Sequence, residues 1–371
     1  MSAARIERVR SALSTAGVQA LIVTHPPNIR YLTGLAASAG ALIIGATQCT
    51  LIVDSRYLEV ARGVAARIDG ITVRLASGSI DQAIGEQSRS CQVSRVAIEA
   101  AYLPVSRYER LRAALDQDSA DFSAAGLRTR AQIVPTEGLV ERLRAIKDAE
   151  ELARLREAAR RLSAVASRAR EFVQPGRSEL AVAALVDAAI RAAGFERPAF
   201  DTIVASGPNS ALPHAHPTSR MLTEGDGVVL DFGGIYDGYC VDLTRTLHLG
   251  PPGAGFRRLF SAVRDAQAAA LAAVKPGARA TDIDGAARRV LERHGLLEAF
   301  GHGTGHGLGL EVHEEPRISA LAPEDARVET GMVFTVEPGA YLPGRGGVRI
   351  EDDVVVTESG CELLTNVAVE L

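Results

Sequence analysis

A weak internal repeat in the C-terminal two thirds of this chain most constrains how it can fold. The tetrapeptide VQPG at 173–176 returns as VKPG at 274–277, 101 residues later, and each copy precedes a helical pattern that ends at a glycine. Asp231 and Glu337 each follow a glycine by six residues, at the end of an apolar run. The tetrapeptide alone would be a coincidence, but the matched helices and carboxylates favour duplication. We therefore predict two similar helix-and-strand halves related by an approximate two-fold axis.

The residues before this repeat predict a separate, small α/β domain. Short apolar runs bounded by turn residues predict buried strands at 20–24, 41–44, 50–53 and 96–98. Helical patterns lie between them, at 57–67 and 105–115. A charged, Ala-rich amphipathic segment at 146–173 then predicts one long helix that opens a second domain. Because 371 residues favour two domains, we place their boundary within 130–145 and divide the chain into 1–135 and 136–371.

Composition and charge exclude several classes of function. The 41 Lys and Arg residues are balanced by 45 Asp and Glu, without a basic run, so a nucleic-acid partner is not expected. No apolar run reaches the length of a membrane span, so we expect no membrane association. The four cysteines, Cys49, Cys91, Cys240 and Cys361, are far apart and form no C-x-x-C pair. Isolated thiols are typical of a reducing compartment, and the predicted location is the cytoplasm.

Two aspartates flank a turn-rich segment in the second domain. Asp231 ends an apolar strand, and Asp242 lies 11 residues later, after the sequence GGIYDG. This spacing predicts a hairpin whose two carboxylates face one space. Solvation or turn capping is the alternative, and the pair alone leaves it open.

A glycine-rich segment carries two imidazoles. The sequence GHGTGHGLG at 301–309 places five glycines around His302 and His306, which indicates a backbone that approaches another group closely. A phosphate-binding loop is the rival interpretation, but neither a G-x-G-x-x-G register nor a following Lys supports it. A metal-binding or catalytic segment is therefore favoured.

The third and fourth candidate segments are carboxylates at strand ends. Glu337 ends an apolar strand and is followed by Pro-Gly, where a charge is costly unless a cation is close. In VRIE at 348–351, strand alternation places Arg349 and Glu351 on one face. The next two residues, Asp352 and Asp353, are expected to be solvated.

One imidazole and four carboxylates suit two divalent ions of borderline-to-hard character. Manganese is favoured, with cobalt, zinc and iron as the other ions that this ligand set suits. Two carboxylates would bridge the ions, which would activate a water molecule and polarise a carbonyl group. The predicted ligands are Asp231, Asp242, His306, Glu337 and Glu351.

At these residues the chain also resembles a known family, the creatinase, prolidase and methionine aminopeptidase family with the pita-bread fold. The similarity is greatest to its proline-specific branch, and it also rests on NIRYLTG at 28–34, VDSRY at 53–57, IKDAE at 146–150 and SGPNSALPH at 206–214. It implies an α/β (α+β) fold, with a creatinase-like N-terminal domain before a pita-bread domain that has a pseudo-two-fold repeat.

The resemblance also implies an activity, which is hydrolysis of the Xaa-Pro bond in dipeptides or at the N-terminus of short peptides by a metal-bridging hydroxide. By this resemblance Asp231 chelates one ion and His306 the other, while Asp242 and Glu351 bridge them. Glu337 would be both a ligand and the group that takes the proton from the attacking hydroxide. A homodimer is implied as well.

The same resemblance implies a set of substrate-side residues. His214 and His313 match the histidines that steady the carbonyl and the tetrahedral intermediate. His302, Tyr341 and Arg349 match positions that line the proline or leaving-group side. Without the resemblance, a surface histidine, ordinary strand packing and an ordinary ion pair are the alternative interpretations for residues of these types.

Two other functions remain as alternatives. A hydrolase of the same fold could act on a non-proline peptide or on a small non-peptide amide. A non-catalytic relative could bind peptides, although such proteins usually have eroded ligand positions and all five are filled here. Metal content and the cleavage of Ala-Pro, Ala-Pro-Ala and Ala-Ala would discriminate among these functions.

Overall fold

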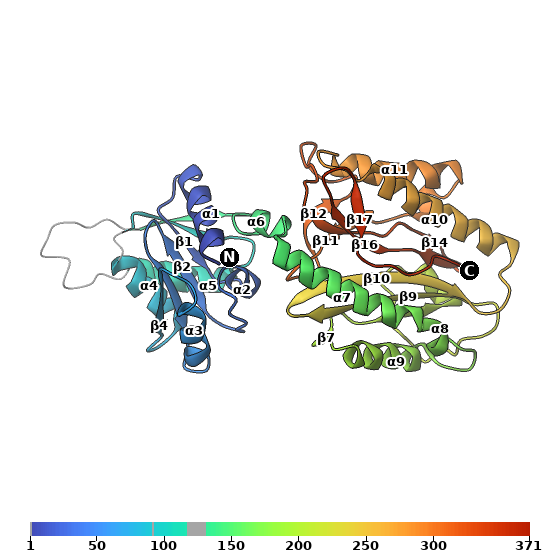
Figure 1. The fold of residues 1–371 in the computed structure, drawn as a ribbon, viewed down its shortest axis with the longest axis horizontal. Coiled ribbons are helices and arrows are strands. Elements are labelled where there is room, and N and C mark those ends of the chain that lie inside the picture. Colours follow the sequence, from blue (N-terminus) through green and yellow to red (C-terminus); the bar gives the residue numbers. More distant parts are fainter. Residues whose placement is uncertain (1, 91–92, 117–130) are drawn as a thin grey trace, which may run out of the picture. The chain divides into compact units, whose positions relative to one another are not determined.

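The computed structural model describes residues 2–90, 93–116 and 131–371, so Cys91 lies outside the described residues. The chain forms two compact units, Met1–Arg144 and Ala145–Leu371 (Figure 1). This division lies within the interval 130–145 that the sequence suggested. The domain limits 1–135 and 136–371 stay a prediction.

The first unit is built around one mixed sheet. Its strand order is β4-β3-β2-β1-β5-β6, in which β1, β2 and β3 pair antiparallel and the other neighbours pair parallel. The strands are β1 (Ala20–Val23), β2 (Ala41–Gly45), β3 (Cys49–Val53), β4 (Ile71–Leu75), β5 (Arg95–Glu99) and β6 (Gln132–Thr136). The helices are α1 (Ser2–Thr15), α2 (Pro26–Thr33), α3 (Leu58–Ala65), α4 (Ile80–Ser90), α5 (Val105–Asp116) and α6 (Glu141–Ala145). The four strands and two helices predicted here are confirmed to within a few residues.

A buried carboxylate in this unit gives a structural reason for Asn28, the first residue of the segment NIRYLTG. Glu99, at the end of β5, accepts hydrogen bonds from the backbone N–H groups of Thr24 and His25 and from Asn28 Nδ2. Burial raises the pKa of Glu99, while these donors lower it. The Glu99 carboxylate therefore ties β5 to the start of α2, and its role in this unit is structural.

The second unit begins with a helix that has a complete N-terminal cap. Asp148 accepts hydrogen bonds from the N–H groups of Glu150 and Glu151, and the Glu151 side chain accepts one from the N–H of Asp148. This capping box starts α7 (Ala149–Ser167). The single helix predicted at 146–173 is divided, because Arg168 leaves the helical conformation and a short helix, α8 (Ala169–Phe172), follows it.

The structure confirms the internal repeat in the second unit. The helices α9 (Glu179–Ala192) and α11 (Ala280–Arg293) occupy equivalent positions, each after a glycine with φ 82°. The N–H of Gly176 donates to Leu222 O, and the N–H of Gly277 donates to Val328 O, so the same contact recurs in both halves. The second unit has two apolar cores: α7, α9 and the strands β8 to β10 enclose one, to which Leu308, Val333 and Val355 of the second half also belong, and α10, α11 and β13 to β16 enclose the other.

The strands of this unit form three further sheets, and the helix α10 (Ala254–Ala273) lies between β10 and β11 in the chain (Figure 1). The strands are β7 (Arg197–Pro198), β8 (Ile203–Ser206), β9 (Gly227–Tyr236), β10 (Tyr239–His248), β11 (Gly305–Gly307), β12 (Glu314–Ile318), β13 (Val333–Val336), β14 (Gly339–Leu342), β15 (Gly346–Arg349), β16 (Asp352–Val356) and β17 (Cys361–Leu363). Among the described helices, none combines the length and the apolar character that crossing a membrane requires.

Candidate metal centre

The predicted hairpin carries the first two acidic residues to one face of a sheet. Strands β9 and β10 are joined by the two-residue turn Asp237-Gly238, in which both residues have positive φ, the turn that suits a right-handed twist. In this register Asp231 lies opposite Thr244, and Asp242 lies two residues before Thr244 on the same strand. Because alternate residues of a strand share a face, Asp231 and Asp242 point to the same side.

The glycine-rich segment brings His306 close to three carboxylates. His306 lies in β11, and a Cβ atom on either neighbour, Gly305 or Gly307, would collide with the backbone of an adjacent strand. The close approach expected from these glycines is therefore confirmed for both. His306 Nε2 lies 3.6 Å from Glu337 Oε1 and 4.0 Å from Asp242 Oδ2.

Glu351 completes the group from the segment between β15 and β16. One potential ligand atom from each of Asp242, His306 and Glu351 lies within 4.8 Å of the other two. Thr244 holds Glu351 at two points: its Oγ1 donates to Glu351 Oε2 at 2.5 Å, and its carbonyl oxygen accepts from the N–H of Glu351 at 3.1 Å. Thr244 was not predicted, although its position two residues after Asp242 indicates the shared face.

Asp231 is engaged by a buried arginine in this structure. Arg349 Nη2 donates to Asp231 Oδ2, and Arg349 Nη1 donates to the hydroxyl of Tyr341 at 2.8 Å. The Tyr341 hydroxyl also shares a hydrogen bond with His302 Nε2 at 2.9 Å. The structure thus joins the three residues expected on the leaving-group side in one series of hydrogen bonds that ends at Asp231. These residues are His302, Tyr341 and Arg349.

Burial and mutual repulsion shift the acidity of the clustered carboxylates. Burial raises the pKa of Glu337 to about 7, and the Asp231 charge adds to this rise while Arg349 opposes it. Burial, followed by the charges of neighbouring carboxylates, raises the pKa of Asp242 and Glu351 well above their ordinary values. Carboxylates arranged in this way are costly to ionise together unless cations lie between them.

The donor atoms fit divalent ions. Within the described part of the chain, Oδ1 of Asp231 and Oδ1 of Asp242 are buried and accept no hydrogen bond. His306 Nδ1 lies 3.2 Å from Gly307 O, which favours the tautomer with the proton on Nδ1 and leaves the Nε2 lone pair facing the carboxylates. Burial lowers the pKa of His306, so its ring is neutral, as a ligand must be.

The two substrate-side histidines differ in their surroundings. The ring of His313 packs edge-to-face against the ring of His306, with centroids 4.3 Å apart. Burial lowers the pKa of His313 to about 4. His214 is exposed, and its charge contributes to the pKa shifts of His302, His313 and Glu337. His214 is therefore near the same space, although the five predicted ligands do not include it.

The prediction that Asp352 and Asp353 are solvated is wrong. Asp352 is 4% exposed and Asp353 is 0% exposed. Asp352 pairs with Arg245 at 2.7 Å, and Asp353 Oδ2 accepts from the N–H of Asp242 at 2.9 Å. These partners come from β10, so local alternation could not reveal them.

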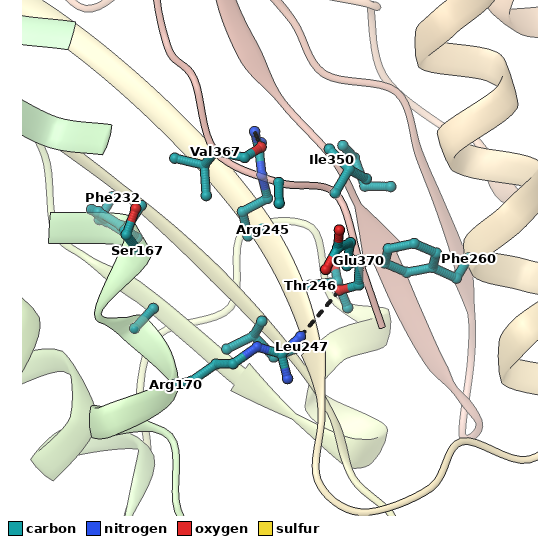
Figure 2. Close-up of a pocket in the computed structure, with 14 residues that line it drawn as sticks. Ser167, Arg170, Phe232, Arg245, Thr246, Leu247, Phe260, Ile350, Val367 and Glu370 are labelled. Carbon is teal, nitrogen blue, oxygen red and sulfur yellow. Dashed lines mark hydrogen bonds between the residues drawn. The ribbon is translucent and has the colours of Figure 1, made fainter. Parts of the chain in front are cut away.

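A cavity of about 200 Å³ has none of the clustered ligands in its wall. Figure 2 shows its lining, which includes Phe232, Leu247, Phe260 and Val367 and none of the five predicted ligands. Arg245 is also part of its wall, with its side chain beside Val367 (Figure 2). The candidate centre is therefore defined by convergent polar atoms and not by this cavity.

The comparisons with known proteins agree with this fold. The sequence model described as "Metallopeptidase family M24" matches residues 153–358, and the "Creatinase/Prolidase N-terminal domain" matches residues 5–146. The chain is 31% identical over 369 residues to the Xaa-Pro dipeptidase of Pyrococcus horikoshii, covering 99% of this chain and 98% of that protein.

Solved structures show the same likeness. An Xaa-Pro dipeptidase from Bacillus anthracis superposes with a TM-score of 0.93 at 36% identity, covering 100% of this chain and 99% of that one. An X-Pro aminopeptidase from Thermotoga maritima gives a TM-score of 0.86 at 32% identity, covering 99% and 98%. A two-domain fold with clustered carboxylates and one imidazole defines a metal-dependent hydrolase. More particularly, the chain belongs to metallopeptidase family M24 and is an enzyme.

Proposed function

We propose that this enzyme hydrolyses the Xaa-Pro bond of dipeptides, or of short peptides at their N-terminus, with two divalent ions. The convergence of Asp242, His306 and Glu351 within 4.8 Å is the observation that carries this proposal. Glu337 and Asp231 lie beside these three and would supply the remaining ligands. The names of the Xaa-Pro dipeptidases from Pyrococcus horikoshii and Bacillus anthracis support the substrate class.

The chain's own residues would divide the chemistry among them. When bound, the ions would polarise the substrate carbonyl and lower the pKa of a water molecule. Glu337 would accept a proton from the attacking water at its carboxylate, and that proton would be delivered to the leaving nitrogen. His313, whose lowered pKa keeps it neutral, donates an N–H to the developing oxyanion, together with His214.

The leaving-group side would be formed by the chain of hydrogen bonds from His302 through Tyr341 to Arg349. Burial lowers the pKa of His302 to about 4 and raises the pKa of Tyr341 to about 12, so both side chains are uncharged at neutral pH. Uncharged, rigidly held rings suit a proline ring, and Arg349 would pair with its carboxylate. The pairing of Arg349 with Asp231 then has to be exchanged for a pairing with substrate when metal occupies Asp231.

A metal measurement followed by a peptide panel tests this function. Purified protein is expected to hold about two divalent ions per chain, and Asp242→Asn is expected to reduce that content. The manganese-loaded wild type should cleave Ala-Pro or Ala-Pro-Ala and leave Ala-Ala intact. Cleavage of Ala-Ala alone would refute the proline assignment, and a wild-type protein that binds no divalent ion would refute the metal centre.

We infer further that the native ion is manganese and that the protein is a cytoplasmic homodimer. The described cysteines Cys49, Cys240 and Cys361 are free, which supports a reducing compartment. Light scattering of the purified protein should give twice the mass of 39.1 kDa. Metal analysis of protein purified from its source without added ions should find manganese in excess of cobalt, zinc and iron.

A further inference from the structure

A buried arginine joins strand β10, which carries Asp242, to the segment that carries Glu351. Arg245 lies in β10, three residues after Asp242, and its side chain is 7% exposed. Its Nη1 donates to Thr244 O at 2.9 Å and to Glu351 O at 2.5 Å. Its Nη2 donates to Asp352 Oδ1 and to Val367 O, both at 2.7 Å. One planar side chain therefore contacts β10, the backbone of Glu351 and the segment that follows β17.

The partner carboxylate is held in place from two other elements. Gln267, in α10, donates from Nε2 to Asp352 Oδ2 at 2.7 Å. Thr365 Oγ1 donates to Asp352 Oδ1 at 2.8 Å and accepts from the N–H of Asp353 at 3.1 Å. Both oxygens of Asp352 are thus hydrogen-bonded, so these contacts fix the geometry of the ion pair with Arg245 as well as compensating its charge.

The geometry of Glu351 depends on this arrangement. Thr244 O accepts both the N–H of Glu351 and a proton of Arg245 Nη1, while Arg245 also binds the carbonyl oxygen of Glu351. The backbone of Glu351 is therefore held on its N–H side and on its C=O side by residues of β10, the strand that bears Asp242. Asp242 and Glu351 come from different halves of the repeat. The contacts between β10 and the Glu351 segment, which we call the seam, therefore set the separation between their carboxylates.

We propose that Arg245 is a positioning residue whose forked guanidinium fixes the spacing of the Asp242 and Glu351 carboxylates and so sets the affinity of the enzyme for its divalent ions. This inference rests on the metal centre of the proposed function. It assigns no contact with substrate to Arg245. A lysine at the same position would keep the charge opposite Asp352, but its single ammonium could not hold three carbonyl groups and a carboxylate at once.

The test compares Arg245→Lys with a matched control, Arg220→Lys. Arg220 forms a similar bidentate pair with Asp226, at 2.6 and 2.8 Å, in the same unit but without contact to a candidate ligand. Titration of the chelator-treated protein with Mn²⁺ by calorimetry should show affinity about 10- to 100-fold weaker for Arg245→Lys and unchanged within about twofold for Arg220→Lys. At saturating Mn²⁺, kcat of Arg245→Lys on Ala-Pro should recover to within a few fold of the wild type.

Each outcome has a separate meaning. A folded Arg245→Lys protein that binds Mn²⁺ as tightly as the wild type overturns the proposal, because a purely structural role would lower only the unfolding midpoint. If Arg245→Lys does not fold, Gln267→Met, which removes one donor to Asp352, should still weaken Mn²⁺ binding several-fold, and unchanged affinity overturns the proposal. A wild type that binds no divalent ion refutes the metal centre itself, whereas one that binds Mn²⁺ without cleaving Ala-Pro refutes only the substrate assignment.

Discussion

The buried carboxylate of Glu337 should make the metal-free enzyme less stable as pH rises. Its pKa is raised from the ordinary 4.5 to about 7 in the folded protein, so between these pH values the folded chain holds a proton that the unfolded chain has released. The resulting stabilisation is fully present below pH 4.5 and is lost as pH rises through 7. The difference between 4.5 and about 7 corresponds to about 3 kcal/mol of unfolding free energy.

Replacement of Glu337 by glutamine isolates this contribution. The amide has the shape of the protonated acid and cannot ionise, so metal-free Glu337→Gln should match the wild type near pH 5. At pH 8 the variant should be the more stable protein, by up to about 3 kcal/mol. Glu329→Gln, at an exposed position in the same unit, serves as the control and should show the pH dependence of the wild type.

Urea unfolding of chelator-treated protein, followed by circular dichroism between pH 5 and pH 8, measures these differences. Because the chain has two compact units, the relevant transition is the one that Glu337→Gln displaces and Glu329→Gln does not. Asp242 and Glu351 have pKa values raised in the same direction, so a smaller slope of the same sign should remain in Glu337→Gln. Equal pH dependence in wild type and Glu337→Gln, or a wild type that gains stability relative to the variant as pH rises, would refute the reasoning.

Three further predictions concern the ligands and their neighbours. Thr244→Val removes the hydroxyl that donates to Glu351, which should weaken Mn²⁺ binding in calorimetric titration by roughly 10- to 100-fold, whereas Thr244→Ser should stay within about threefold of the wild type. Tyr341→Phe removes the hydroxyl that joins His302 to Arg349, and steady-state kinetics on Ala-Pro should show KM raised by roughly tenfold, with a smaller change in Mn²⁺ affinity. Removal of metal by a chelator should abolish hydrolysis and lower the thermal midpoint, and added Mn²⁺ should restore both, since a ligand at about 100 times its Kd stabilises by about 2.7 kcal/mol.

The parts of the fold that depend on local pattern could be predicted from the sequence. The apolar run at 20–24 forms β1, and the hairpin that bears Asp231 and Asp242 follows from an apolar run, an Asp-Gly turn and a second run. The strand-end position of Glu337, directly after β13, follows in the same way. In each case the determining residues are neighbours in the chain, so periodicity and turn chemistry are sufficient.

The environment of the site depends on residues that are distant in sequence. Asp352 and Asp353 follow Glu351 directly, and a run of three acidic residues would ordinarily be solvated. Their burial requires Arg245 and Thr365, which reach them from a different strand and from the segment after β17. The division of the predicted helix at Arg168 is equally absent from the pattern, because the amphipathic spacing continues through that residue.

The duplication explains why these long-range contacts gather at the proposed site. Asp231 and Asp242 belong to the first half of the repeat, while His306, Glu337 and Glu351 belong to the second. Neither half contains enough ligands to hold two ions, so on the proposed site the ions would join carboxylates of both halves. The ion pair of Arg245 with Asp352 spans the same seam, since β10 belongs to the first half and β16 to the second. Loss of metal should therefore loosen the strands beside the ligands before it loosens the helices, and hydrogen exchange should rise first in β10 and β16 and last in α9 and α11.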